Sequence, residues 1–137
     1  MALTHLIDTS LISRLGAETV RAVLDPLAHA GRIGRAGITD LEIGYGSRNA
    51  KEWDQDMADL AIFELVETTA DHVRRARQVQ RLLASRSQRG RKVPDLLIAA
   101  AAEEEGLILL HYDADFDQIA KVTGQHCQWV VPAGTVD

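Results

Sequence analysis

Apolar and polar residues follow two different spacings along this chain. Short apolar runs bounded by glycine or polar residues are typical of buried strands, and apolar residues that recur every three or four positions are typical of amphipathic helices. The short runs predict strands at 3–7, 65–66, 107–110 and 128–131, and the glycine-rich stretch 31–37 can supply a fifth. The longer spacing predicts helices at 11–15, 17–30, 39–47, 50–63, 70–84, 94–105 and 116–122. Because strands and helices alternate, we expect a single α/β domain over residues 1–137, with helices on both faces of a mainly parallel sheet of four to five strands.

Single residues predict where some helices begin or end and which side chains face inward. Asn49 is expected to cap the helix that follows it, and Gly106 to end the helix that precedes it. The apolar spacing places Trp53 and Val73 on the inward faces of their helices. The polar and basic residues 85–92 are expected to form a loop between two helices.

Carboxylates follow two of the predicted strands. Asp8 comes directly after the first strand, and Asp113 and Asp115 follow the four apolar residues that end at Leu110. Two further acids, Glu42 and Asp95, lie in the opening turns of predicted helices. In open α/β sheets, ligands bind in the crevice outside the carboxyl ends of the strands. We therefore expect these acids to meet at one rim of the sheet.

Acids gathered at one rim need a cation. Clustered carboxylates repel one another and raise each other's pKa unless a positive charge neutralises them. A ligand set made of oxygen atoms selects hard ions such as Mg²⁺ or Mn²⁺. A metal held in this way activates water and stabilises the charge of a phosphodiester under attack. The acidic set therefore predicts metal-dependent hydrolysis at phosphate.

Each acid also has a structural interpretation when it is taken alone. Asp8 can cap the turn that follows it. Glu42 completes a capping box with Thr39, and Asp95 lies in the first turn of a helix, where the helix dipole favours an acid. These interpretations account for the acids one at a time, but not for their convergence on one rim.

Composition and charge narrow the classes of function. The single cysteine, Cys127, excludes an intrachain disulfide, and the five histidines show no zinc-site spacing. The longest apolar run, 96–102, is far shorter than the roughly 18 residues of a transmembrane helix, and no signal peptide is recognisable, so we expect a soluble, cytoplasmic protein. A net charge of −5 argues against a general polyanion binder. It leaves room for nucleic-acid chemistry, because part of the negative charge belongs to the acidic set.

A calcium loop can be excluded at the second group of acids. Asp113, Asp115 and Asp117 stand at alternate positions, as in a calcium loop. Such a loop also needs glycine at its sixth position and glutamate at its twelfth. Those positions are Gln118 and Gly124 here.

Eight of the fifteen basic residues lie between positions 74 and 92. They can form a phosphate-contacting patch that guides a nucleic acid toward the acids. The alternative is a solvated helix face followed by a loop. Arg91 and Lys92 are nearest in sequence to Asp95 and are the expected substrate contacts.

Four short motifs occur in order along nearly the whole chain: Ile7-Asp8-Thr9-Ser10, Thr39-x-x-Glu42-x-x-x-Gly46, Pro94-Asp95-x-x-Ile98-Ala99-Ala100-Ala101 and Asp113-x-Asp115-Phe116. Their order and spacing resemble those of the PIN-domain ribonucleases, specifically the VapC-type toxins of bacterial toxin–antitoxin pairs. The resemblance implies a PIN-like α/β/α fold and a metal-dependent endoribonuclease. It also implies a homodimer that is held inactive by a cognate VapB-type antitoxin.

The resemblance assigns roles by motif match. It implies four catalytic acids: Asp8, Glu42, Asp95 and Asp113. It implies four metal ligands: Asp8, Asp95, Asp113 and Asp115. In this scheme a metal-bound water attacks the scissile phosphate, and Glu42 completes the ligand shell or orients that water. Thr9 or Ser10 would contact the metal-bound water or the phosphate.

Two other functions are considered. An aspartate-nucleophile phosphatase would use Asp113-x-Asp115, but Phe116 stands where threonine or valine is expected. A catalytically silent member of the same fold, binding RNA or protein, would be favoured by the loss of a motif acid. All four motif acids are present.

Overall fold

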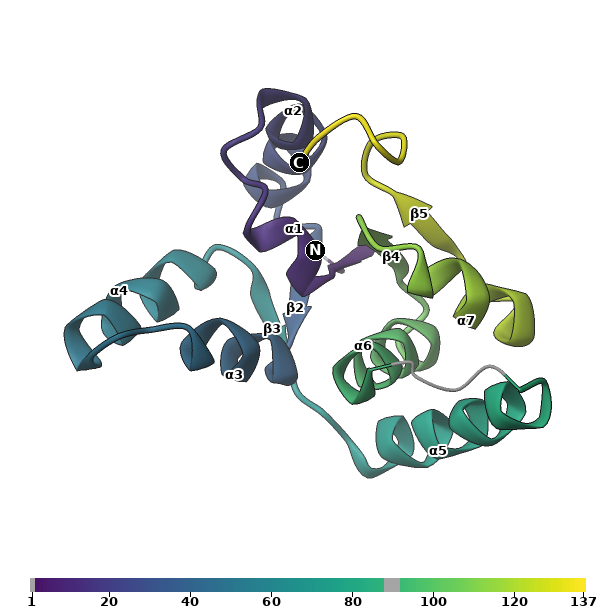
Figure 1. Cartoon of the computed structure of the whole chain (residues 1–137). Coiled ribbons are helices and arrows are strands. Elements are labelled where there is room, and N and C mark those ends of the chain that lie inside the picture. Colours follow the sequence, from purple (N-terminus) through teal and green to yellow (C-terminus); the bar gives the residue numbers. More distant parts are fainter. Residues whose placement is uncertain (1, 88–91) are drawn as a thin grey trace.

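A computed structural model describes residues 2–87 and 92–137 of the chain (Figure 1). Its five strands form one parallel sheet in the order β3-β2-β1-β4-β5. The strands are β1 (His5–Ile7), β2 (Ile33–Ala36), β3 (Glu64–Val66), β4 (Ile108–His111) and β5 (Cys127–Trp129). The helices are α1 (Thr9–Ile12), α2 (Glu18–His29), α3 (Gly37–Tyr45), α4 (Ala50–Leu60), α5 (Ala70–Ser85), α6 (Val93–Glu104) and α7 (Asp115–Thr123). The predicted α/β class and parallel sheet are confirmed, and the glycine-rich stretch supplies the fifth strand.

The strand order creates a switch point between β1 and β4. From β1 the chain moves outward to β2 and β3, and from β4 it moves outward the other way to β5. Ile7 pairs in register with Leu110, so the two central strands end side by side. A crevice forms where connections from adjacent strands leave in opposite directions.

The central strands bury both of their faces. Leu6 and Leu109 pack with residues of α5, α6 and α7 on one face, and Ile7 and Leu110 pack with residues of α1, α2 and α4 on the other. All four side chains have no exposed surface. Such burial on both faces is typical of parallel strands covered by helices, and it gives the three layers seen in Figure 1.

Helix α6 can lie close against the sheet because its middle is made of small residues. Residues 99–102 are four alanines, each at most 2% exposed. α6 lies between the sheet and α5, so its interior positions are covered on both sides (Figure 1). Gly106 follows the helix with φ +69°, a left-handed conformation that glycine adopts without strain, as expected for the end of this helix.

Other local predictions have mixed outcomes. Asn49 caps α4 as expected, accepting a 2.9 Å hydrogen bond from the Glu52 N–H. The inward placements of Trp53 and Val73 are wrong, because these side chains are 45% and 44% exposed. On α5, His72 is the neighbouring residue that turns inward, and it is fully buried.

The expected loop at 85–92 falls in part outside the described residues, which leave out 88–91. Of the helices in the described ranges, none is both long enough and apolar enough to span a bilayer.

Candidate active site

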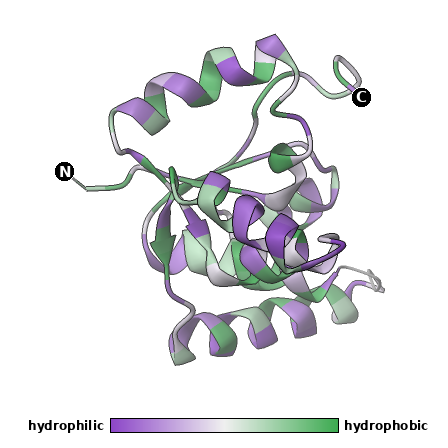
Figure 2. Ribbon diagram, turned by 90° about the vertical axis from the view of Figure 1, so that its left-hand side faces the viewer, coloured by the Kyte–Doolittle hydropathy of each residue, from purple (hydrophilic) through white to green (hydrophobic). Residues whose placement is uncertain are grey.

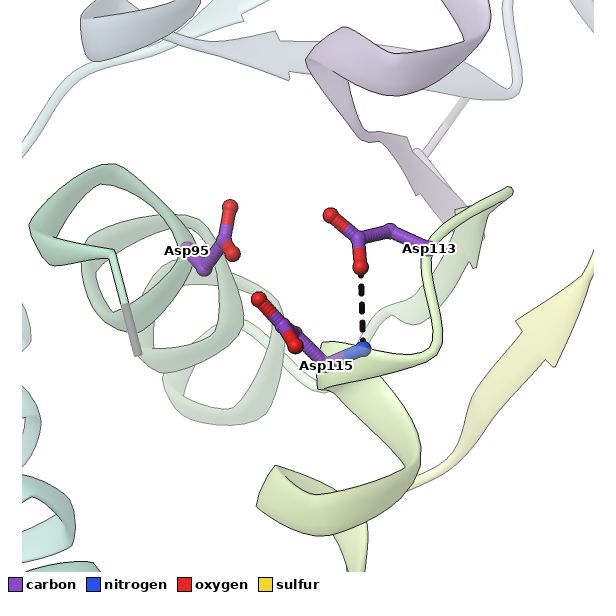
Figure 3. A group of neighbouring side chains, drawn as sticks. All are labelled: Asp95, Asp113 and Asp115. Atoms are coloured by element: carbon purple, nitrogen blue, oxygen red, sulfur yellow. Dashed lines mark hydrogen bonds between the residues drawn. The ribbon is translucent and has the colours of Figure 1, made fainter. Parts of the chain in front are cut away.

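Three acids point toward one another at the carboxyl edge of the sheet (Figure 3). Asp95 comes from the first turn of α6, Asp113 from the loop after β4, and Asp115 from the start of α7. One carboxylate oxygen from each lies within 4.8 Å of the other two. Asp113 Oδ1 also accepts a 2.9 Å hydrogen bond from the Asp115 N–H, which fixes the turn that holds both residues.

Asp8 reaches the same edge from the neighbouring strand. Its N–H donates to the Leu110 carbonyl at 2.9 Å and extends the pairing of β1 with β4 by one residue. Its Oδ2 accepts a 2.9 Å hydrogen bond from the Ser10 N–H and caps α1. The capping interpretation is therefore confirmed, and it does not compete with a role in the site, because Oδ1 is not used by the cap.

Glu42 is held by the Thr9 hydroxyl, which is supported in turn by the hydroxyl of Thr39. Thr9 Oγ1 donates to Glu42 Oε1 at 2.7 Å and lies 2.9 Å from Thr39 Oγ1. A hydroxyl has one proton to donate. Because Thr9 donates its proton to Glu42, Thr39 must donate to Thr9. The carboxylate of α3 is thus tied to the first residue of α1.

The capping-box interpretation of Thr39 and Glu42 is wrong. α3 begins at Gly37 with Ala36 in the capping position, so Thr39 lies inside the helix and is fully buried. The sequence predicts Thr39 as a cap and as part of a motif, but sequence reasoning missed its role in supporting Glu42. Its spacing of three from Glu42 is also the spacing that places two side chains on one helix face, which could have revealed it.

The four motif acids share one surface hollow of about 260 Å³. Its lining is Asp8, Thr9, Ser10, Ser13, Glu42, Ile43, Lys92, Asp95 and Asp113. Lys92 is the basic residue among them. Ser10 Oγ accepts a 3.0 Å hydrogen bond from the Tyr112 N–H, which ties α1 to the end of β4. The other expected substrate contact, Arg91, lies outside the described residues.

Burial and mutual repulsion raise the pKa values of two of these acids. Burial, followed by the charges of the neighbouring carboxylates, raises the pKa of Asp95 to about 7. Burial raises the pKa of Asp8 to about 6, against the opposing effect of its hydrogen bonds with Ser10, and the charges of Glu42 and Asp113 add to the rise. The site therefore resists full ionisation at neutral pH when no cation balances its charge.

The residues present fit a hard divalent ion. Asp8 Oδ1 and Asp95 Oδ2 are buried and have no hydrogen-bond partner within the described ranges. Leaving a buried polar atom without a partner costs about 1–3 kcal/mol, and more for a charged group. A metal ion would satisfy both oxygens and offset the repulsion, and a set of carboxylate oxygens is what Mg²⁺ and Mn²⁺ prefer.

His111 supports the backbone at Asp113. It is fully buried, and its Nδ1 accepts a 3.2 Å hydrogen bond from the Asp113 N–H. Its ring lies 5.0 Å from the rings of both Phe116 and Trp129. Burial lowers the pKa of His111, so the neutral ring accepts through Nδ1 and holds the backbone of a site aspartate.

Comparison with known proteins identifies the family. Residues 5–122 match the sequence profile of the PIN domain. The chain is 64% identical, over the full length of both proteins, to ribonuclease VapC51 of Mycobacterium tuberculosis. It is 38% identical to ribonuclease VapC21 of the same species, over 98% of this chain and 99% of that protein. The chain belongs to the PIN-domain family and, within it, to the VapC proteins.

Solved structures agree on the fold. The DNA-bound VapBC of Salmonella typhimurium superposes with a TM-score of 0.78 over 94% of this chain and 99% of that chain, at 18% identity. VapBC-1 of nontypeable Haemophilus influenzae superposes with a TM-score of 0.75 over 95% of this chain and 98% of that chain, also at 18% identity. The three-layer arrangement with a parallel sheet is therefore the PIN-like fold.

Proposed function

We propose that this chain is a metal-dependent endoribonuclease and the toxin of a toxin–antitoxin pair, held inactive by a VapB-type antitoxin. The VapC relatives are named as ribonucleases, and the solved structures with the same fold include VapBC complexes. The observation that carries the proposal is the pair of buried, partnerless oxygens on Asp8 and Asp95 inside a hollow lined by four acids. A catalytically silent member of the fold that binds no metal would gain nothing from such a costly arrangement.

Asp8, Asp95, Asp113 and Asp115 would hold Mg²⁺ or Mn²⁺. A divalent ion in this position lowers the pKa of water and offsets negative charge on a phosphate. Cleavage is a hydrolysis, in which the oxygen of water forms a bond to phosphorus and the ester bond to one ribose oxygen breaks.

Other residues of the hollow orient the reactants. Glu42 accepts from Thr9 through Oε1, so its other oxygen can align the attacking water. Lys92 places a positive charge at the mouth of the hollow for the scissile phosphate, and Arg91 would add a second. Ser10 lines the same hollow, where its hydroxyl can meet a phosphate oxygen.

The proposal extends to assembly and location. We take residues 1–137 as one nuclease domain that works in the cytoplasm, where its RNA substrate is found. Leu41 and Tyr45, one turn apart on α3, are 69% and 93% exposed. Exposed apolar side chains grouped in this way favour a protein–protein contact, and a second copy of the chain would cover them in a homodimer.

Cleavage and metal binding can be tested together. The purified protein should cut single-stranded RNA with Mg²⁺ or Mn²⁺, stop when a chelator is added, and bind Mn²⁺ in a calorimeter. Asp8→Asn should lose both cleavage and most of the metal affinity, whereas Asp54→Asn, an exposed acid on α4, should keep both. A wild-type protein that neither cuts RNA nor binds metal would instead be a silent member of the fold, and full activity in Asp8→Asn would refute the assigned site.

A further inference from the structure

We propose that the outward face of α5 binds the RNA strand beyond the point of cleavage, through phosphate contacts from Arg74, Arg77 and Arg81. We call these three residues the α5 basic face. RNA is the ligand because the proposed function makes it the substrate, so this surface rests on that function and extends it beyond the acid-lined hollow.

The charge of the chain is divided very unevenly. Residues 70–92 contain eight basic residues and one acid, a net charge of +7. The rest of the chain contains seven basic residues and nineteen acids, a net charge of −12. A polyanion is repelled by most of such a molecule and attracted to this segment, in which α5 holds four of the eight basic residues.

The basic residues of α5 are aligned. Ala76, Val79 and Leu83 form the buried side of the helix. Arg74, Arg77 and Arg81 follow at spacings of three and four on the opposite, exposed side, over about 10 Å of helix length. They border a surface hollow of about 650 Å³ whose lining is Arg74, Arg77, Gln78, Gln80, Arg81 and Ala84. The guanidinium and amide groups of this lining can all donate hydrogen bonds to a polyanion.

Two of these arginines are not used by the fold. Arg75, on the side of α5 that faces α6, donates to Glu103, and Arg74 pairs with Asp71. Arg77 and Arg81 have no ion pair or hydrogen bond with any other residue in 2–87 or 92–137. Their planar guanidinium groups are therefore free to bind phosphate oxygens in a bidentate manner.

The helix that carries the α5 basic face is connected to the active site along the chain and through α6. α5 packs against α6, the helix that carries Asp95 (Figure 1). Lys92, the last residue before α6, lines the acid-lined hollow. α5 is the outermost helix on its side of the molecule, at the lower edge of Figure 2, so nothing in the described structure covers its outward side. We therefore expect an RNA strand of sufficient length that leaves the hollow past Lys92 to reach the outward side of α5.

Binding can be measured without cleavage. The probe is a fluorescein-labelled single-stranded RNA of about 20 nucleotides, followed by anisotropy in a chelator over a range of salt concentrations. Arg77→Gln/Arg81→Gln should reduce the slope of log K against log salt by about 1.4, because each phosphate contact contributes about 0.7 for a single strand. The matched control is Lys51→Gln/Lys121→Gln, which removes two exposed charges from other helices and should leave the slope nearly unchanged.

Cleavage assays distinguish a role of the α5 basic face from a role of the acid-lined site. With Mg²⁺, Arg77→Gln/Arg81→Gln should lower kcat/KM by about tenfold on the long RNA and by less than twofold on an oligonucleotide of about four nucleotides, which is too short to reach α5. Equal slopes in the arginine and lysine variants, or an equal loss on both substrates, would overturn the proposal. Unchanged RNA binding with an altered molar mass in light scattering would also overturn it, because the face would then be a protein interface. A wild-type enzyme that fails to cut either RNA would contradict the proposed function, while the binding result would still decide the role of α5.

Discussion

Thr9 Oγ1 donates a 2.7 Å hydrogen bond to Glu42 Oε1 and so joins the first residue of α1 to the middle of α3. The two residues are 33 positions apart in sequence, and both line the hollow that also contains Asp8. The bond occupies Oε1 of Glu42 and leaves Oε2 available to take part in the reaction. This bond and three other features of the molecule lead to predictions that can be measured.

The first concerns the Thr9 hydroxyl. Thr9→Val keeps the shape of the side chain but removes the donor, so Glu42 loses its orientation. We expect kcat on RNA to fall about tenfold to a hundredfold while the free energy of unfolding changes by about 1 kcal/mol. Thr9→Ser, which restores a hydroxyl, should recover most of the activity. Wild-type kcat in Thr9→Val would show that Glu42 needs no such support.

The second concerns the pH dependence of stability in the metal-free protein. The pKa values of Asp8 and Asp95 are about 6 and about 7 in the fold, above the value near 3.8 that such groups have in an unfolded chain. Between pH 4 and 7 the native state therefore binds more protons than the unfolded state, and the free energy of unfolding falls as pH rises. The contribution is complete below about pH 4 and is lost as pH rises through 6 and 7.

Thermal unfolding in a chelator from about pH 5 to pH 8 checks this sign. The melting temperature should decrease over that range, and Asp8→Asn/Asp95→Asn should flatten the decrease. A wild-type melting temperature that rises steadily through the window would contradict the crowded arrangement of acids.

The third concerns Asp95 alone. Asp95→Asn removes one charge from a buried group of carboxylates and keeps the size of the side chain. We expect the metal-free variant at about pH 7.5 to be more stable by on the order of 1–3 kcal/mol, which is several degrees in melting temperature, and to be inactive on RNA. Asp25→Asn, at an exposed position of α2, is the control and should have the same melting temperature as the wild type. A lower melting temperature in Asp95→Asn would mean that the acids do not repel one another.

The fourth concerns the glycine-rich strand β2. A Cβ added to Gly34 would lie 2.8 Å from the Glu64 carbonyl oxygen and 2.8 Å from Leu3 Cδ1. Because the first of these contacts is with backbone, the strands must move apart. Gly34→Ala should therefore destabilise the protein by about 1–3 kcal/mol. Gly16→Ala has no heavy atom within 4 Å of the added Cβ and should unfold within about 0.5 kcal/mol of the wild type in denaturant titration.

The same glycine shows what limits prediction from the sequence. The stretch 31–37 is poor in aliphatic residues and looks like a weak strand, but β2 lies between β1 and β3 in the sheet. Gly34 is there because the Glu64 carbonyl of β3 and the side chain of Leu3 come too close for a side chain. The neighbouring strand thus determines why position 34 is glycine. The pattern of residues within 31–37 alone does not reveal this reason.

Val73 and His72 on α5 show the same limit of prediction from a single segment. Apolar spacing assigned Val73 to the inward face of α5, but the fully buried residue is His72, whose Nε2 lies 3.2 Å from Glu105 Oε2. Hydrophobicity ranks a valine above a histidine for burial. The carboxylate of Glu105, at the C-terminal cap of the next helix, reverses the order by pairing with the ring.

The sequence by itself determined the alternation of strands and helices, the parallel sheet, and the positions of Asp8 and Asp113 just beyond two strands. These features follow from periodicity and local burial, which each segment carries within about ten residues. Only the tertiary structure decided the strand order, the Thr39–Thr9–Glu42 chain of hydrogen bonds, and which carboxylate oxygens are left without a partner. Those features depend on contacts between segments that are tens of residues apart, and hydrogen bonds and repulsion between such segments exist only after the chain has brought them together.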